Sequence, residues 1–147
     1  MRVSLSLREK GIQVVGSFHC PARKASATLD FVVDTGSARS FLAWEDALSA
    51  KIDAENLPSH PRQILGFGGT AQAREVRDVC FIYLRSDDSK LEEVEMPDGI
   101  LVYKPPPKKA KHWVPGPAVS LLGRDFLTRS KYVLHADLAR NVIYFER

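Results

Sequence analysis

The feature that most constrains this chain is an apolar, strand-like run that leads directly into an acidic residue and a glycine. It occurs once and reads Phe31-Val32-Val33-Asp34-Thr35-Gly36-Ser37. Apolar and β-branched residues of this kind are typical of a buried strand, and Gly36 permits a tight backbone turn that other residues resist. An aspartate at the end of a buried strand is poorly solvated, so its neighbours control its protonation. The sequence therefore predicts that Asp34 is placed for acid–base chemistry.

Length and charge predict one domain without a strong affinity for polyanions. The 147 residues are enough for a single domain, 1–147, with a substantial core. The net charge of +3 is too small to predict binding to nucleic acid or to an anionic membrane. A Pro- and Lys-rich stretch, 104–117, is expected to be an exposed, partly extended insertion. A solvated loop is the favoured interpretation of its lysines, with an anionic partner as the alternative.

The cysteines, histidines and termini predict no special chemistry. Cys20 and Cys80 lie in apolar, strand-like stretches, which favours buried free thiols over the alternative of a disulfide. The histidines have no zinc-site spacing, so no metal site is predicted. Residues 1–10 lack the apolar core of a signal peptide, and no apolar stretch approaches the ~18 residues of a membrane span. These features predict a soluble, cytoplasmic protein without a membrane partner.

Strand signals dominate the remainder of the chain. Alternating or β-branched residues predict strands over 3–7, 12–18, 29–33, 41–42, 71–76, 79–84, 91–96, 100–103, 119–122, 132–135 and 141–145. Two short helices are expected, over 44–51 and 124–130. A glycine-rich tip at 66–69 is expected to join two strand arms as a hairpin whose second arm runs to residue 84. The pattern predicts an all-β domain with one or two short helices.

Three motifs occur in a fixed order along the chain. The first is the turn Asp34-Thr35-Gly36-Ser37, and the second is the hairpin tip Gly66-Phe67-Gly68-Gly69. The third is Leu121-Leu122-Gly123-Arg124-Asp125-Phe126-Leu127. Together they resemble the catalytic turn, the flap and the terminal helix of the retropepsin-like aspartic proteases, the single-domain relatives of retroviral proteases. In such folds the glycine, here Gly123, passes close to the catalytic turn, where a Cβ atom would intrude.

The resemblance implies a fold, a reaction and a set of site residues. The fold is a closed, acid-protease-like β-barrel with a flap, active as a homodimer because each chain supplies one catalytic turn. The reaction is that of an aspartic endopeptidase without a cofactor, in which two Asp34 carboxylates share one proton and activate a water. The catalytic residues are Asp34, Thr35 and Gly36. The residues implied for contact with an extended peptide substrate are Ser37, Arg39, Gly66, Phe67, Gly68 and Gly69.

The residues alone also allow structural interpretations. Asp34 can be a turn residue that accepts hydrogen bonds from local amides, and Ser37 can cap the turn instead of contacting Asp34 or a substrate. The tip 66–69 can be an ordinary surface hairpin, although the apolar Phe67 there favours a surface to cover. For the whole chain, the alternative is a dimeric peptide-binding or scaffolding module of the same fold with weak catalysis. A third hypothesis pairs the chain with a different partner that carries the second aspartate.

The sequence departs from the family pattern in two places. Retroviral proteases commonly carry an acidic residue shortly after the catalytic turn, which pairs with the arginine of the helix. Here Ala38 and Arg39 stand at those positions, so Arg124 is expected to have another partner. The segment 86–117 is also longer than its counterpart in compact retroviral proteases.

Overall fold

Alternating apolar and polar residues fold most of the chain into β strands. The structure, a computed structural model, describes residues 1–62, 64–66, 69–104 and 119–147. The strands in these residues are β1 (Arg2–Ser4), β2 (Ser6–Arg8), β3 (Gly11–Cys20), β4 (Ala25–Val33), β5 (Phe41–Leu42), β6 (Ile64–Gly66), β7 (Gly69–Val76), β8 (Cys80–Arg85), β9 (Leu91–Met96), β10 (Ile100–Lys104), β11 (Ser120–Leu122), β12 (Val133–Asp137) and β13 (Val142–Glu146). The helices are α1 (Trp44–Ser49) and α2 (Arg124–Ser130), with 3₁₀ helices at Pro21–Arg23 and Ala54–Asn56. The predicted all-β class with short helices is confirmed.

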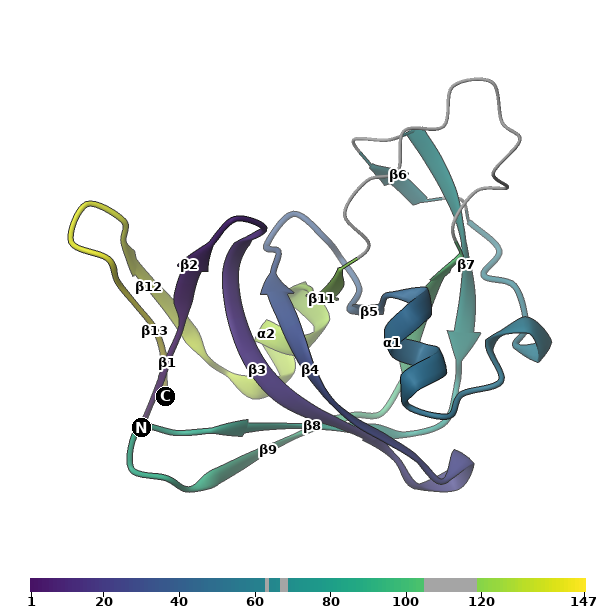
Figure 1. Cartoon of the computed structure of the whole chain (residues 1–147), viewed down its shortest axis with the longest axis horizontal. Coiled ribbons are helices and arrows are strands. Elements are labelled where there is room, and N and C mark those ends of the chain that lie inside the picture. Colours follow the sequence, from purple (N-terminus) through teal and green to yellow (C-terminus); the bar gives the residue numbers. More distant parts are fainter. Residues whose placement is uncertain (63, 67–68, 105–118) are drawn as a thin grey trace.

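The strands form one large curled sheet and one small sheet (Figure 1). The large sheet has ten strands in the order β6-β7-β10-β5-β11-β4-β3-β8-β9, with β2 paired to β3. This order places β4 beside β11 as a parallel pair. The sheet is a curled half-barrel instead of the expected closed barrel, because its terminal strands in the described part of the chain, β6 and β9, do not pair with each other. Strand β9 instead lies against α2.

Apolar side chains on the two faces of the sheet form two clusters. The largest fully buried members of the main core include Phe18, Phe31, Phe126 and Phe145. Successive strand residues point to opposite faces, so Leu42 joins the main core while its neighbour Phe41 joins a second cluster. The second cluster consists of Phe41, Ala73 and Leu101, with Tyr103 and Leu121 packed against it. The strands between β7 and β11 therefore present an apolar surface on each side.

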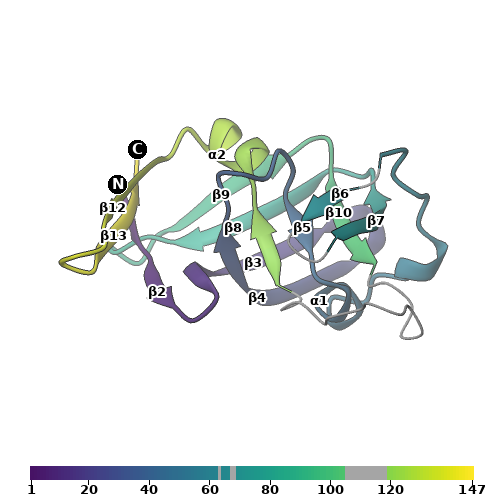
Figure 2. The same ribbon diagram turned by 90° about the horizontal axis from the view of Figure 1, so that it is seen from above.

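Helix α2 covers the residues predicted for it. It begins at Arg124, directly after the extended Gly123, and ends before Lys131, whose left-handed backbone (φ 59°) terminates it. Inside the core, the Phe126 ring lies 6.2 Å from that of Phe145, which attaches the helix to β13. Seen from above, α1 and α2 lie on opposite sides of β5 and β11 (Figure 2). Across the described residues, no helix combines the length and apolar character needed to cross a membrane.

The hairpin of β6 and β7 is shorter than predicted. Gly66 pairs with Gly69, so the glycine-rich tip lies where the sequence predicts it, but β7 ends at Val76. Strand β8 begins at Cys80 and pairs with β3 and β9 instead of continuing the hairpin. The prediction of a second arm running to residue 84 was wrong because β7 and β8 have different partners, β10 for the first and β3 for the second.

Two predictions concern residues outside the described part of the chain. Phe67 and Gly68 of the predicted flap tip are among these residues, as are residues 105–117 of the predicted exposed insertion. Lys104, the first residue of that insertion, is the last residue of β10.

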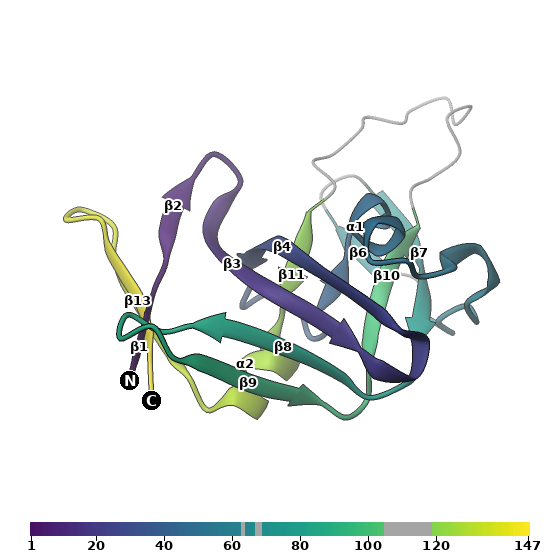
Figure 3. The same cartoon turned by 60° about the horizontal axis from the view of Figure 1, so that its bottom comes forward.

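A small sheet joins the two ends of the sequence. Strand β13 lies in its centre, paired antiparallel with β1 on one side and with β12 on the other. The predicted C-terminal hairpin is therefore present as β12 and β13. Figure 3 shows this sheet to one side of the β8–β9 hairpin, with the two termini close together.

Cys20 and Cys80 are buried free thiols, in agreement with the favoured prediction. In the antiparallel register of β3 and β8, His19 lies opposite Phe81. The next residues along the two strands are Cys20 and Cys80, so the two cysteines face each other. Burial, together with the nearby Cys20, raises the pKa of the Cys80 thiol well above its ordinary value. The folded state therefore favours the neutral thiol.

The free energy of unfolding is expected to decline at alkaline pH because of Cys80. Its folded-state pKa is raised above the unfolded value of about 8.5, so its contribution is complete below that pH and is lost progressively above it. Urea denaturation between about pH 7 and about pH 10 measures this slope. Cys80→Ala should have a shallower slope over the same range. Equal slopes for the variant and the wild type would contradict the prediction.

Candidate active site

The Asp34 turn leaves the large sheet where two parallel strands end side by side. Val33 of β4 lies next to Leu122 of β11, and the Asp34 N–H donates to the Leu122 carbonyl at 2.9 Å. This bond extends the ladder one residue beyond β4, so the sheet determines where the turn begins. The Asp34 residue is half-buried, whereas Thr35 and Gly36 at the tip are exposed.

Hydrogen bonds within the turn orient the Asp34 carboxylate. The Gly36 N–H donates to Asp34 Oδ1 at 2.9 Å, and the Ser37 N–H donates to the Asp34 carbonyl at 3.2 Å. The Ser37 hydroxyl donates to the Arg39 carbonyl at 2.7 Å, which connects the turn to the loop that follows it. One oxygen of the carboxylate is therefore held by the chain itself. The contact predicted between Ser37 and a substrate stays a prediction.

Arg124 holds the same turn from the first residue of α2. Its Nη1 donates to the carbonyls of Thr35 and Gly36, both at 3.1 Å, and its N–H donates to the Ser37 carbonyl at 2.8 Å. Several donors on one planar guanidinium suit such a pair of neighbouring acceptors. Backbone carbonyls thus take the place of the acidic partner that the sequence lacks at Ala38.

Gly123 allows α2 to approach the turn closely. A Cβ atom there would lie 2.5 Å from the Arg39 carbonyl oxygen and 2.8 Å from that of Ser37, well inside van der Waals contact. The φ angle of Gly123, −93°, is one that any residue adopts. The position therefore requires glycine for space alone. The predicted intrusion of a side chain at this position is confirmed.

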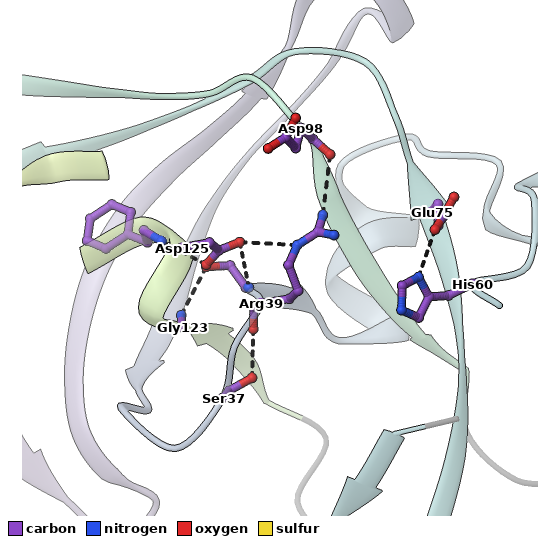
Figure 4. Close-up of polar contacts among 9 residues, drawn as sticks. Ser37, Arg39, His60, Glu75, Asp98, Gly123 and Asp125 are labelled. Carbon is purple, nitrogen blue, oxygen red and sulfur yellow. Dashed lines mark hydrogen bonds and ion pairs between the residues drawn. The ribbon is translucent and has the colours of Figure 1, made fainter. Parts of the chain in front are cut away.

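An ion pair between Arg39 and Asp125 lies directly after the turn (Figure 4). Arg39 Nε lies 3.4 Å from Asp125 Oδ2, and Arg39 Nη2 donates to the Asp98 carbonyl at 3.3 Å. Asp125 also accepts hydrogen bonds from the Ser40 N–H at 3.0 Å and from its hydroxyl at 2.7 Å. The loop thus carries the arginine and the helix carries the acid, the reverse of the arrangement that the family pattern implies. The predicted substrate contact of Arg39 is not tested by this ion pair and stays a prediction.

The base of β7 is attached to the segment that precedes β6. The His60 N–H donates to the Ala73 carbonyl and the Glu75 N–H donates to the Pro58 carbonyl, both at 2.8 Å. His60 Nδ1 lies 2.7 Å from Glu75 Oε1, as Figure 4 shows. This hydrogen bond, with a second from Arg77, holds the pKa of Glu75 below its usual value. The longer arm of the hairpin is therefore fixed at its base.

The predicted site residues fall into two groups in the structure. Residues 34–39 form one continuous loop held by β11 and α2, whereas Gly66 and Gly69 lie apart, paired in the β6–β7 hairpin. A cavity of about 570 Å³ lies between the β2–β3 turn, β4 and α1, and Asp34 is not among its lining residues. The sequence missed the roles of Ser40 and Asp125. The only signal for Asp125 was its charge, which is opposite to that of Arg39.

Comparison with known proteins identifies the fold. No protein-family model matches the chain, and no curated protein sequence matches it significantly. A retropepsin-like aspartic protease from Rickettsia conorii matches with a TM-score of 0.57 and 15% identity, over 99% of this chain and 89% of that chain. The EIAV protease in complex with the inhibitor HBY-793 matches with a TM-score of 0.44 and 17% identity, over 79% of this chain and 84% of that chain. On the evidence of the first match, the chain has the fold of the retropepsin-like aspartic proteases.

Proposed function

We propose that this chain is an aspartic endopeptidase whose active site forms when two copies bring their Asp34 turns together. The observation that carries the proposal is the support given to this turn. The sheet holds its start through Leu122, and α2 holds its carbonyls through Arg124. A catalytic carboxylate must be kept in a fixed orientation by its surroundings, whereas a simple strand connection has no such need. The retropepsin-like fold supports the same reaction class.

In the proposed reaction, two Asp34 carboxylates about 3 Å apart share one proton, because both cannot easily ionise at that separation. The ionised carboxylate takes a proton from a water held between them, and this water attacks the scissile carbonyl carbon. The protonated partner donates its proton to the carbonyl oxygen. Proton transfer to the amide nitrogen then allows the C–N bond to break. In each turn, the Gly36 N–H keeps one Asp34 oxygen oriented.

A second copy is proposed because the reaction needs two carboxylates and the turn occurs once in these 147 residues. Thr35 and Gly36 are exposed in the single chain, so the tip of the turn is accessible to a second copy. In a symmetric dimer the same surface meets itself. Each Thr35 hydroxyl can then form a hydrogen bond across the interface, which would stiffen both turns.

The proposed substrate is an extended peptide that pairs through its main chain. The second apolar cluster supports pockets for apolar side chains near the turn. Leu121, which packs against this cluster, lies opposite Val32, and Val32 is two residues before Asp34. Arg39 is proposed to contact the substrate from the loop, and residues 66–69 from the flap. The chemistry requires no metal or organic cofactor.

Phe67→Ala is expected to lower kcat/KM several-fold to a few tens-fold with little change in Tm. Phe67 is the one large apolar residue among the glycines of 66–69, and its full burial against a ligand or the opposite flap is worth about 2 kcal/mol. Truncation of a core phenylalanine would instead cost about 3–5 kcal/mol of stability. Steady-state kinetics and melting curves separate these cases. An unfolded variant would place this residue in the core, and an unaltered variant would make the tip an ordinary surface turn.

The proposed function is tested with a mixture of peptides of diverse sequence, incubated with the purified protein from acidic to neutral pH. Mass spectrometry should detect internal cleavage of some peptides. A peptide that carries a hydroxyl-bearing carbon in place of the scissile carbonyl mimics the tetrahedral transition state and should block the cleavage. Peptides that bind without being cut would favour the scaffolding alternative instead.

A further inference from the structure

The Asp125 carboxylate joins α2 to the loop that follows the Asp34 turn. It accepts two hydrogen bonds from Ser40, one from the N–H at 3.0 Å and one from the hydroxyl at 2.7 Å. The Ser40 hydroxyl in turn accepts a hydrogen bond from the Gly123 N–H at 2.9 Å, and Ser40 is 0% exposed. A continuous, partly buried network therefore connects the helix to the loop.

Arg39 supplies the positive charge that balances Asp125 (Figure 4). The two side chains are 32% and 23% exposed, so the ion pair is partly shielded from water. The hydrogen bond from Arg39 to the Asp98 carbonyl reaches the turn between β9 and β10. The pair thus connects three segments that meet only in the folded chain: the loop, the helix and the β9–β10 turn.

This ion pair is two hydrogen bonds away from Asp34. The Ser37 hydroxyl binds the Arg39 carbonyl at 2.7 Å, and the Ser37 N–H binds the Asp34 carbonyl at 3.2 Å. These two hydrogen bonds form a path through Ser37 by which a shift of the Arg39 backbone can reach Asp34. Arg124, the residue before Asp125, binds the carbonyls at the tip of the same turn. Two adjacent residues of α2 thus hold this part of the chain. Arg124 binds the tip of the turn, and Asp125 binds the loop that follows it.

We propose that Asp125 and Arg39 are positioning residues that set the orientation of Asp34 for catalysis. The proposal rests on the proposed protease activity. It gives a role in that activity to Arg39 and Asp125, whose charges are exchanged between loop and helix relative to the family pattern. A displacement of a catalytic group by about 1 Å can lower a rate about a hundredfold. Loss of the pair should therefore lower kcat. Asp125→Asn should change KM little, because the Asp125 carboxylate is bonded within the chain to Ser40 and Arg39.

The test compares Asp125→Asn, Arg39→Gln and Arg39→Lys in the 147-residue chain, in the oligomeric state in which the wild type cleaves peptide. The number of active sites is first titrated with a tight-binding transition-state analogue, so that kcat is expressed per functional site. Asp125→Asn is expected to lower this kcat about tenfold to a hundredfold, with KM within about twofold of wild type. Arg39→Gln should also lower kcat per site. Arg39→Lys, which keeps the positive charge, should retain most of the wild-type kcat. The double variant Arg39→Gln/Asp125→Asn should be no slower than Asp125→Asn alone, because each single change already removes the same ion pair.

Arg129→Gln is the matched control. Arg129 is also in α2, and its ion pair with Glu95, at 3.9 Å, is more exposed than that of Asp125. Its removal should leave kcat per site unchanged. Arg39→Gln leaves the bonds between Asp125 and Ser40 in place, so it tests the ion pair in a folded protein even if Asp125→Asn does not fold.

The outcomes are distinguishable. A lower Tm with unchanged kcat per site would overturn the proposal and make the pair merely structural. A raised KM with unchanged kcat in the Arg39 variants would also overturn it and leave Arg39 with only the substrate contact proposed above. Wild-type protein that cleaves no peptide would remove the proposed function and this proposal together. If the wild type cleaves peptides and both Asp125→Asn and Arg39→Gln have wild-type kinetics, this proposal alone is removed.

Discussion

Asp34→Asn should abolish peptide hydrolysis while the chain stays folded. Asparagine has nearly the same shape as aspartate, and its amide oxygen can still accept the Gly36 N–H now bonded to Asp34 Oδ1. It cannot take up or release the proton on which the proposed reaction depends. In the proposed dimer both carboxylates come from this one position, so a single substitution removes the whole pair. A loss of more than about a thousandfold in kcat is expected.

The measurement combines steady-state kinetics with a melting curve for each protein. Asp30→Asn is the matched control, because Asp30 is an exposed carboxylate on the same strand, β4. It should retain wild-type activity and stability. Hydrolysis that persists in an Asp34→Asn preparation free of wild-type protein would reject the assignment as an aspartic protease.

Gly123→Ala is expected to damage both stability and activity. The new Cβ atom would lie 2.5 Å from the Arg39 carbonyl oxygen and 2.7 Å from the carbonyl carbon, so either α2 or the loop must move. Overpacking of this kind costs about 3 kcal/mol of stability at the upper end of its usual range. The shift also displaces the turn that Arg124 holds, so kcat should fall about a hundredfold or more.

Urea denaturation and steady-state kinetics measure the two effects. Thr128→Ala, at an exposed position of α2, is the control and should change the free energy of unfolding by less than about 0.5 kcal/mol. If Gly123→Ala were as stable and as active as the wild type, the close contact between α2 and the loop would not constrain the turn.

Local patterns predicted the elements well, but not all of their partners. The start of α2 was predictable because Gly123 directly precedes the helical segment, whereas the left-handed backbone of Lys131 that ends the helix is seen only in the structure. The extent of the β6–β7 hairpin was not predictable, because β7 pairs with β10 whereas β8 pairs with β3. Such pairings join residues far apart in sequence, and the alternation of a single strand does not specify them.

The same limit applies to the candidate site. The Asp34 turn could be predicted from its own residues, and the close approach of Gly123 from the resemblance to the retropepsin-like proteases. The partners of Arg124 could not, because they are the backbone carbonyls of Thr35 and Gly36, and every residue carries a carbonyl. The reversed ion pair of Arg39 and Asp125 becomes evident only when the fold places the loop beside α2.

The central claim, that one active site requires Asp34 from two chains, is tested most directly by mixing wild-type and Asp34→Asn chains. Equal amounts are unfolded together, refolded, and assayed at a fixed total concentration. If each site needs both aspartates and the chains pair at random, about one quarter of the wild-type activity should remain, because only dimers of two wild-type chains are active. A chain that is active by itself would retain about one half of the activity in the same mixture. The first result is the one predicted here, and the second would contradict it.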